Sequence, residues 1–125
     1  MRKQYNFRHG DDGLHAWDVG RLLELAADVP VQEIAVDTIT EVDTVYWYDF
    51  GETPTVRSVV DHARLMNEVD LSHPIILAPD GRVMDGMHRI ARCLLDGRAT
   101  ILAKRLPALP PPDFRNVAPG DLPYD

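Results

Sequence analysis

The chain has 125 residues, of which 45% are hydrophobic and 26% charged, a balance typical of one globular domain and not of a disordered chain. A formal net charge of -7 argues against a protein whose main task is to hold a nucleic-acid backbone, because that task needs a basic face. The single cysteine excludes an internal disulfide bond, and the N-terminal residues lack the apolar core of a signal peptide. No stretch reaches membrane-spanning length, so we expect a cytoplasmic protein.

Residues 1–30 predict an arm followed by a short helix. Residues 1–16 have a loop composition without periodicity, so we expect an irregular arm there. Asp18 is a good N-cap for a helix that ends near Pro30. Its apolar stripe consists of Val19, Leu22, Leu23 and Ala26. This helix is interpreted as a packing element.

The next segment predicts two strands, the second of which has two interpretations. Residues 31–39 place Ile34, Val36 and Ile39 among polar neighbours, and we expect a strand there. Residues 40–52 are dense in acids and aromatics. They predict either a strand, with Trp47 on one face and Tyr46 and Tyr48 on the other, or the aromatic and acidic wall of a pocket. We favour the strand, and retain Glu52 as a candidate catalytic carboxylate because it lies just before a helix start.

A helix is predicted from Thr53 to about Val69. Thr53 and Pro54 are typical of an N-cap and a first helical position. Its predicted buried stripe consists of Val56, Val59, Val60, Ala63 and Met66. His62 lies off this stripe, so a solvated helix surface explains it best.

Residues 74–106 predict a compact α+β unit. An apolar strand at 75–77, a turn at Pro79–Gly81 and a second strand form a hairpin. A helix follows, with the stripe Met87, Ile90, Ala91, Leu94 and Leu95. Gly97 suits a left-handed helix terminator, and residues 99–106 predict a further strand.

The junction before this helix carries the candidate chemistry. Gly86 can turn backbone N–H groups outward, and His88 and Arg89 follow on the polar side of the first turn, a pattern typical of a phosphate cradle. Arg92 extends the basic face by one turn. In the alternative interpretation Asp85 caps the helix and pairs with Arg89, leaving nothing to bind. Both interpretations stay open at this stage.

The segment Val83–Ala91, VMDGMHRIA, resembles the ParB/sulfiredoxin-like superfamily, and the likeness extends over residues 31–106. It is closest to the Asp-Gly-His-His-Arg form of ADP-dependent free serine kinases, with Met87 in place of the first His. Sulfiredoxins have their catalytic Cys at the position of Met87, so their activity is not implied. The resemblance implies an α+β fold in which a small mixed sheet packs with helices.

The same resemblance implies a nucleoside di- or triphosphate bound with Mg²⁺. Backbone N–H groups of Gly86 and Met87 and the side chains of His88 and Arg89 would hold phosphate oxygens, and Asp85 would act as metal ligand or base. To these we add Arg92 and Glu52 as cofactor-binding and catalytic candidates. A thioether cannot replace the proton chemistry of a histidine, so Met87 favours binding over turnover.

Three functions remain possible from the sequence. The first is a nucleotide hydrolase or small-molecule phosphotransferase. The second is a non-catalytic nucleotide-sensing or protein-interaction module, with another protein or a second copy as its partner. The third, a DNA-processing accessory protein, is disfavoured by the acidic charge.

The last segment, residues 107–125, predicts an extended tail. It holds six of the ten prolines and has no periodicity. We expect it either to lie on the domain or to face a partner.

Overall fold

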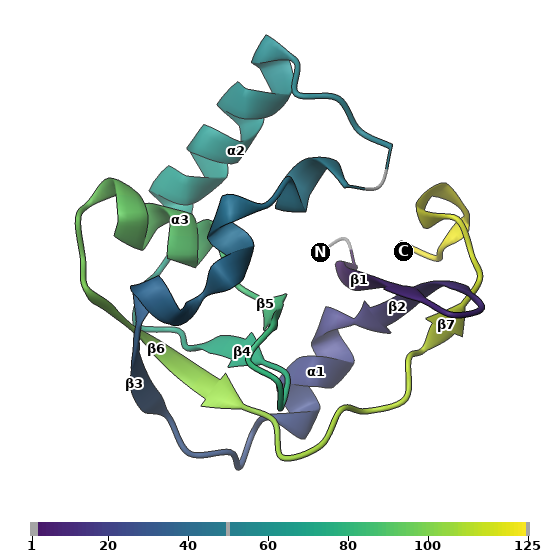
Figure 1. Ribbon diagram of the computed structural model, residues 1–125, viewed down its shortest axis with the longest axis horizontal. Helices are drawn as coiled ribbons and strands as arrows, with labels where there is room; N and C mark the ends of the chain where they lie inside the picture. Colours follow the sequence, from purple (N-terminus) through teal and green to yellow (C-terminus); the bar gives the residue numbers. More distant parts are fainter. Residues whose placement is uncertain (1–2, 50, 125) are drawn as a thin grey trace.

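Two small sheets organise the part of the chain that the computed structural model describes, residues 3–49 and 51–124 (Figure 1). The architecture is α+β, as predicted. In chain order the elements are β1 (Tyr5–Gly10), β2 (Gly13–Asp18), α1 (Val19–Leu25), β3 (Gln32–Ala35), the 3-10 turns η1 (Val36–Thr38), η2 (Thr40–Asp43) and η3 (Tyr46–Tyr48), α2 (Val56–Glu68), β4 (Ile75–Leu77), β5 (Val83–Asp85), α3 (Met87–Leu95), β6 (Thr100–Arg105), β7 (Phe114–Arg115) and η4 (Pro119–Asp121).

The larger sheet has the strand order β3-β6-β4-β5. The predicted hairpin is confirmed, because β4 and β5 pair antiparallel and Gly81 takes a positive φ of 88° at the turn. α3 then carries the chain over the sheet, so that β6 returns parallel to β4. The first predicted strand is shorter than expected: β3 ends at Ala35 and a 3-10 turn follows.

The two faces of the larger sheet bury different clusters, because neighbouring strand residues point to opposite sides. One cluster packs α3 and the 3-10 segment, residues 36–48 with the turns η1 to η3, on the sheet. It comprises Val36, Ile39, Ile75, Leu77, Val83, Met87, Ile90, Cys93, Ile101 and Ala103. The other packs α1 and β2 on the opposite face; it comprises Trp17, Leu22, Ala26, Ile76, Ala78, Met84 and Leu106.

α3 begins and ends as the sequence predicts. Its N-cap Gly86 has φ 112°, and a Cβ at that position would lie only 2.5 Å from Cγ2 of Ile75. Gly97 has φ 68°, and its N–H donates to the carbonyl oxygen of Leu94 at 3.2 Å. The predicted stripe is partly wrong, because Cys93 is buried while Leu94 and Leu95 are 49% and 68% exposed. The buried face is therefore rotated toward Cys93, and hydrophobicity alone did not distinguish these neighbours.

The expectation of an irregular N-terminal arm is wrong for the described residues. β1 and β2 form an antiparallel hairpin, and β2 also pairs with β7 of the tail through Ala16 and Phe114. A strand whose second partner lies almost 100 residues further on leaves little local signal. The predicted cap of α1 is confirmed, because the Asp18 carboxylate accepts from the N–H of Gly20 at 2.8 Å. α1 ends at Leu25, earlier than expected.

The second predicted strand, in residues 40–52, is also wrong for the residues that the structure describes, which leave out Phe50. η2 and η3 satisfy backbone groups locally; for example, the N–H of Tyr48 donates to the carbonyl oxygen of Val45 at 2.7 Å. Tyr46 and Trp47 pack against the cluster that includes α3. The aromatic residues are thus partly buried by packing against α2 and α3, and not by pairing with a neighbouring strand.

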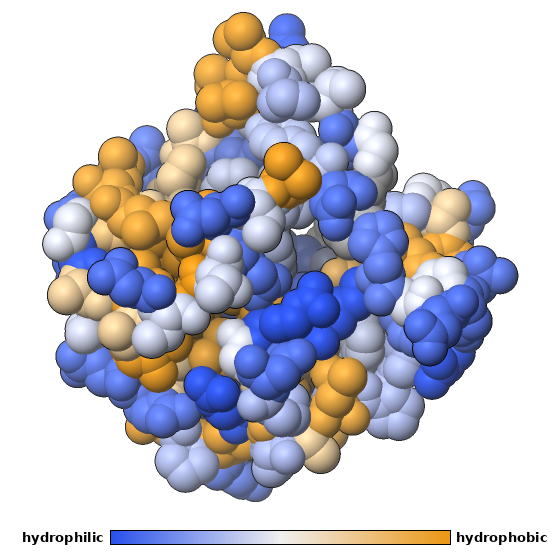
Figure 2. All heavy atoms as spheres, viewed as in Figure 1, coloured by the Kyte–Doolittle hydropathy of each residue, from blue (hydrophilic) through white to orange (hydrophobic). Residues whose placement is uncertain are grey.

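α2 projects from the body of the molecule (Figure 1). Its N-cap is Thr55, whose hydroxyl accepts from the N–H of Ser58, and not the predicted Thr53. The predicted burial of its stripe is wrong: Val56, Val59 and Val60 are 84%, 52% and 47% exposed. Figure 2 shows apolar atoms exposed over the upper end of α2. The helix is amphipathic, but nothing in the described chain covers that face.

The tail is extended and lies on the domain. The Trp17 indole N–H donates to the carbonyl oxygen of Pro110 at 2.8 Å. The backbone N–H of Lys3 donates to the carbonyl oxygen of Tyr124 at 3.0 Å. Asp113 accepts from the Asp18 N–H and from Arg21. Leu122 is buried. No described helix combines the length and apolar character that crossing a membrane requires.

Candidate binding cleft and the start of α3

Arg89 is fully engaged by the fold. Its Nη1 donates to the carbonyl oxygens of His73 and Pro74 at 2.9 and 2.8 Å, and its Nη2 donates to Oδ2 of Asp85 at 2.8 Å. Both side chains of the ion pair are 16% exposed. The pair predicted by the alternative interpretation is therefore present, although Gly86, and not Asp85, is the N-cap. Arg89 fastens the start of α3 to the loop that enters β4.

Arg92 also has internal partners. Its Nε donates to Oδ2 of Asp96 at 2.8 Å, and its Nη1 donates to Oδ1 of Asn67 at 3.3 Å. These contacts join α3 to the end of α2. Neither arginine of α3 therefore presents an unoccupied guanidinium to a phosphate.

His88 forms a stack with His62 and Trp47. The two imidazoles share a hydrogen bond of 2.8 Å between Nδ1 of His62 and Nε2 of His88. The Trp47 ring stacks on both, with centroids 4.2 Å from His62 and 4.8 Å from His88. The predicted solvated position of His62 is wrong, because η3 brings Trp47 into contact with both α2 and α3. The sequence holds no local signal for this contact.

Both histidines of the stack have lowered pKa values. Burial, followed by the neighbouring His62, lowers the pKa of His88 to about 4. Burial also lowers the pKa of His62, while the carboxylates of Glu52 and Asp61 oppose that shift. At neutral pH the pair is uncharged, so one ring donates an N–H to the lone pair of the other. An uncharged His88 adds no positive charge to a phosphate site.

A central cleft of about 470 Å³ lies between β1, the 3-10 segment and the tail. The surface is hollowed at this place near the centre of the view in Figure 2. Its aromatic walls come from the hairpin, through Tyr5 and Phe7, from η3, through Tyr46 and Trp47, and from the tail, through Tyr124. Three segments that are distant in the sequence thus build one aromatic cavity.

Polar atoms of β1 line the same cleft. Asn6 is 6% exposed, and its Nδ2 donates to the carbonyl oxygen of Val83 at 3.3 Å and to the Tyr46 hydroxyl at 3.2 Å. Its Oδ1 has no hydrogen-bond partner in the described structure. Burial, followed by the Glu41 carboxylate, raises the pKa of Tyr46 far above its usual range, so this hydroxyl stays protonated.

Arg8 is the less exposed of the two arginines that line the cleft. Its side chain is 11% exposed, and its Nη1 makes only a long contact of 3.5 Å to Oδ2 of Asp80. Its guanidinium lies 6.0 Å from the centroid of the Trp17 ring. Its Nη2 is buried without a hydrogen-bond partner among the described residues.

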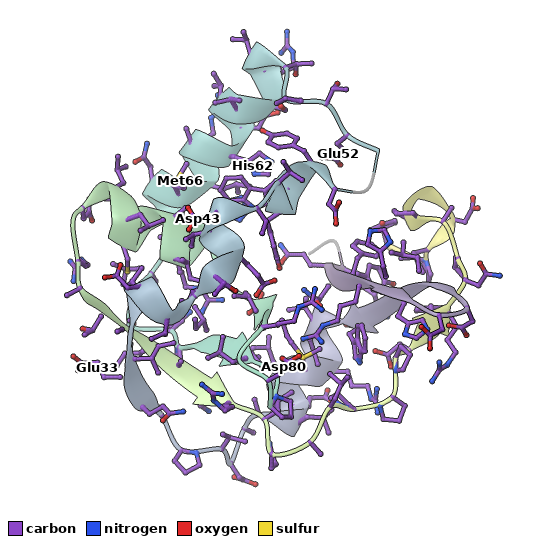
Figure 3. All side chains as sticks on the ribbon, viewed as in Figure 1. Glu33, Asp43, Glu52, His62, Met66 and Asp80 are labelled. Carbon is purple, nitrogen blue, oxygen red and sulfur yellow. The ribbon has the colours of Figure 1, made fainter. Side chains whose placement is uncertain are left out.

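Acidic residues also line the cleft. The Glu41 carboxylate accepts from the N–H of Val83, which ties the 3-10 segment to β5. Asp49 lies 3.3 Å from the imidazole of His9. Glu52 lies on the segment that leads into α2 and faces the cleft (Figure 3).

The predicted site residues do not share one cavity. Glu52 lines the central cleft, whereas Asp85 and Arg89 line a separate recess of about 270 Å³ beside Lys104. Met87 lines an apolar recess of about 180 Å³, and His88 lies in the histidine stack. The described residues contain no group of three or more His, Cys, Asp or Glu side chains arranged to hold a metal ion.

Sequence reasoning missed the residues that line the cleft from β1. Asn6 and Arg8 lie two positions apart and so share one face of a strand. That spacing was the available signal, but it carries meaning only once residues 5–10 are known to be a strand.

Comparison with known proteins yields no relative: no family model, no curated protein and no solved structure matches this chain. The likeness to the ParB/sulfiredoxin-like superfamily stays a prediction from the motif.

Proposed function

We propose that the protein is a ParB-like ligand-binding domain whose central cleft takes a nucleoside phosphate, and that it binds this ligand without turning it over. The observation that carries the proposal is the aromatic cleft of about 470 Å³ between β1, the 3-10 segment and the tail. Its volume falls within the range of small-molecule sites, roughly 300–1,000 Å³.

The walls of the cleft suit a ligand with both a ring and a charge. Tyr5, Phe7 and Tyr46 offer aromatic surface on which a base can stack. Arg8 and Arg82 line the same space and can bind an anionic group. Asn6 and Glu41, which line the cleft, both bond to Val83, the first residue of β5 and of the motif segment.

Binding is favoured over turnover because Asp85 and His88, two of the three predicted catalytic residues, are engaged elsewhere. Asp85 is paired with Arg89, and His88 is uncharged and stacked on Trp47. Met87 provides no proton donor or acceptor of useful strength. These residues hold the fold together around α3 instead of facing the cleft.

The proposal is tested by titration calorimetry with AMP, ADP, ATP and CTP, each with and without Mg²⁺. We expect one-to-one binding of at least one nucleotide. Val45 is 63% exposed and lines the cleft, so Val45→Trp should fill the cleft and weaken binding at least about tenfold. The matched control is Val31→Trp, because Val31 is 50% exposed and does not line the cleft; it should bind like the wild type. Equal binding by both variants, or no binding of any nucleotide, would refute the proposed site.

Turnover is tested separately on the protein that binds. We expect no release of inorganic phosphate above the uncatalysed rate. Phosphate release that disappears in Glu52→Gln would overturn the non-catalytic part of the proposal and establish a hydrolase, since Glu52 is the predicted catalytic carboxylate that lines the cleft.

A further inference from the structure

β1 brings a buried hydrogen-bond donor and a buried acceptor to the central cleft, and the fold satisfies neither. The donor is Nη2 of Arg8 and the acceptor is Oδ1 of Asn6. Residues two apart on a strand point to the same side, so both side chains serve one face of β1. Both residues also line the central cleft.

These two atoms stand out because native folds rarely leave buried polar groups unpaired. An unsatisfied buried group keeps its desolvation cost, and the cost is larger for a charged group. Arg8 has one acceptor in the described chain, Asp80, at the outer limit of hydrogen-bond distance. An anionic oxygen of a ligand would complete the guanidinium, which binds planar oxyanions through paired N–H groups.

Arg82 adds a second cation beside the first. It lies in the turn between β4 and β5, is exposed and lines the cleft, and its guanidinium makes no hydrogen bond to a described residue. Its backbone N–H donates to Oδ1 of Asp80 at 3.0 Å, while Arg8 contacts Oδ2 of the same carboxylate. Asp80 therefore holds the turn that carries Arg82 next to Arg8.

The charges of the cleft limit how negative its ligand is. Among the described residues that line it, Arg8 and Arg82 face the carboxylates of Glu41, Asp49 and Glu52. Glu41 is occupied by the N–H of Val83 and Asp49 by His9. Two arginines in such surroundings suit a single phosphate better than a triphosphate, whose additional charge would lie near carboxylates.

From this arrangement we infer that Arg8 and Arg82 bind the phosphate of a nucleoside monophosphate, while Oδ1 of Asn6 accepts an N–H or O–H of the same ligand. The inference rests on the proposed function and names its ligand class. It places the phosphate on β1 and the β4–β5 turn, away from Arg89 and the start of α3. The N-terminal hairpin, outside the segment that resembles the ParB-like core, is then a required part of the site.

The test compares AMP and CMP with their parent nucleosides and with ATP, by calorimetry on the full chain. Arg82→Gln is the primary variant, because Arg82 is exposed and its loss leaves the core intact; Arg8→Gln is the second. We expect each variant to bind the monophosphate about ten- to a hundredfold more weakly, as expected for losing a hydrogen bond to a charged group, and to bind the nucleoside like the wild type. Arg64→Gln is the matched control, because Arg64 is an exposed arginine of α2 outside the cleft and should have no effect.

The outcomes separate this inference from the proposed function. Unchanged monophosphate affinity in both cleft variants, or tighter binding of ATP than of AMP without Mg²⁺, would overturn the inference while leaving nucleotide binding intact. If no nucleotide binds the wild type, the proposed function fails, and inorganic phosphate becomes the probe. In that case the unfolding temperature is measured in phosphate and in chloride at equal ionic strength. A higher unfolding temperature in phosphate that is lost in Arg82→Gln supports the anion site alone. If phosphate does not raise the unfolding temperature of the wild type, the anion site is overturned as well.

Discussion

Arg89 at the start of α3 and Arg8 in the central cleft are both largely buried, with side chains 16% and 11% exposed, but their donors are used differently. Arg89 has two carbonyl oxygens and a carboxylate within 2.9 Å. Arg8 has one carboxylate at 3.5 Å and a buried nitrogen without a partner. The comparison teaches that the motif arginine builds the fold, whereas the arginine that no motif singled out keeps a buried nitrogen without a partner among the described residues.

The same contrast holds for the residues around each arginine. Gly86, His88 and Arg92 each have a structural explanation in contacts with Ile75, Trp47 and Asp96. The cleft instead gathers aromatic rings around polar atoms that lack partners. Three experiments can break or sharpen this distinction, and they are taken in order of expected effect on stability.

Gly86→Ala should give the largest loss. At φ 112° an L-residue is strained, and the added Cβ would lie 2.5 Å from Cγ2 of Ile75, a buried side chain of β4. We expect the free energy of unfolding to fall by about 3–5 kcal/mol in urea denaturation. Gly97→Ala is the matched control: nothing lies within 4 Å of its Cβ position, so only the strain of φ 68°, about 1–2 kcal/mol, applies. Equal losses in the two variants would show that close packing of Gly86 against Ile75 adds nothing to the cost of the substitution.

Arg89→Met should destabilise the fold by about 2–4 kcal/mol, because it leaves the mostly buried Asp85 carboxylate and two carbonyl oxygens without their donor. Well below its unfolding temperature the variant should bind nucleotide like the wild type. Arg8→Met should do the opposite, changing stability by less than about 1 kcal/mol while weakening ligand binding, since the only ion pair of Arg8 among the described residues is the long contact of 3.5 Å to the exposed Asp80. A stable Arg89→Met variant that no longer binds nucleotide would instead support the phosphate site predicted at the start of α3.

Acid should destabilise the protein through the histidine stack. The folded pKa of His88, about 4, lies below its ordinary value of 6.5, so between these values the unfolded chain binds more protons. The stabilisation is fully present above about pH 6.5 and is lost as the pH falls through that window toward 4. From this group alone we expect the free energy of unfolding, measured by urea denaturation, to be about 2–3 kcal/mol lower at pH 4.5 than at pH 7.

His88→Phe keeps a ring against Trp47 without a titrating group, so its stability should depend less on pH across that window. His73→Gln removes an exposed histidine and should leave the wild-type pH dependence in place. If His88→Phe retains that full dependence, the histidine stack is not its origin.

Local chemistry determined the parts of the fold that the sequence predicted. The β4–β5 hairpin follows from an apolar run and a Pro-Asp-Gly turn, the end of α3 from Gly97, and the start of α1 from Asp18. Each of these features depends on residues only a few positions apart, so the sequence contains its cause. The α+β class follows from the same elements.

Tertiary structure decided the rest, because the deciding partners are distant in the chain. The sheet β1-β2-β7 pairs Ala16 with Phe114, and the 3-10 segment replaces a strand where Trp47 meets His62 and His88. The sequence showed which side chains carry charge. Whether Arg89 or Arg8 keeps an unpaired donor depends on which acceptors folding brings within hydrogen-bond distance, and those acceptors are set by the packing of the sheets and helices.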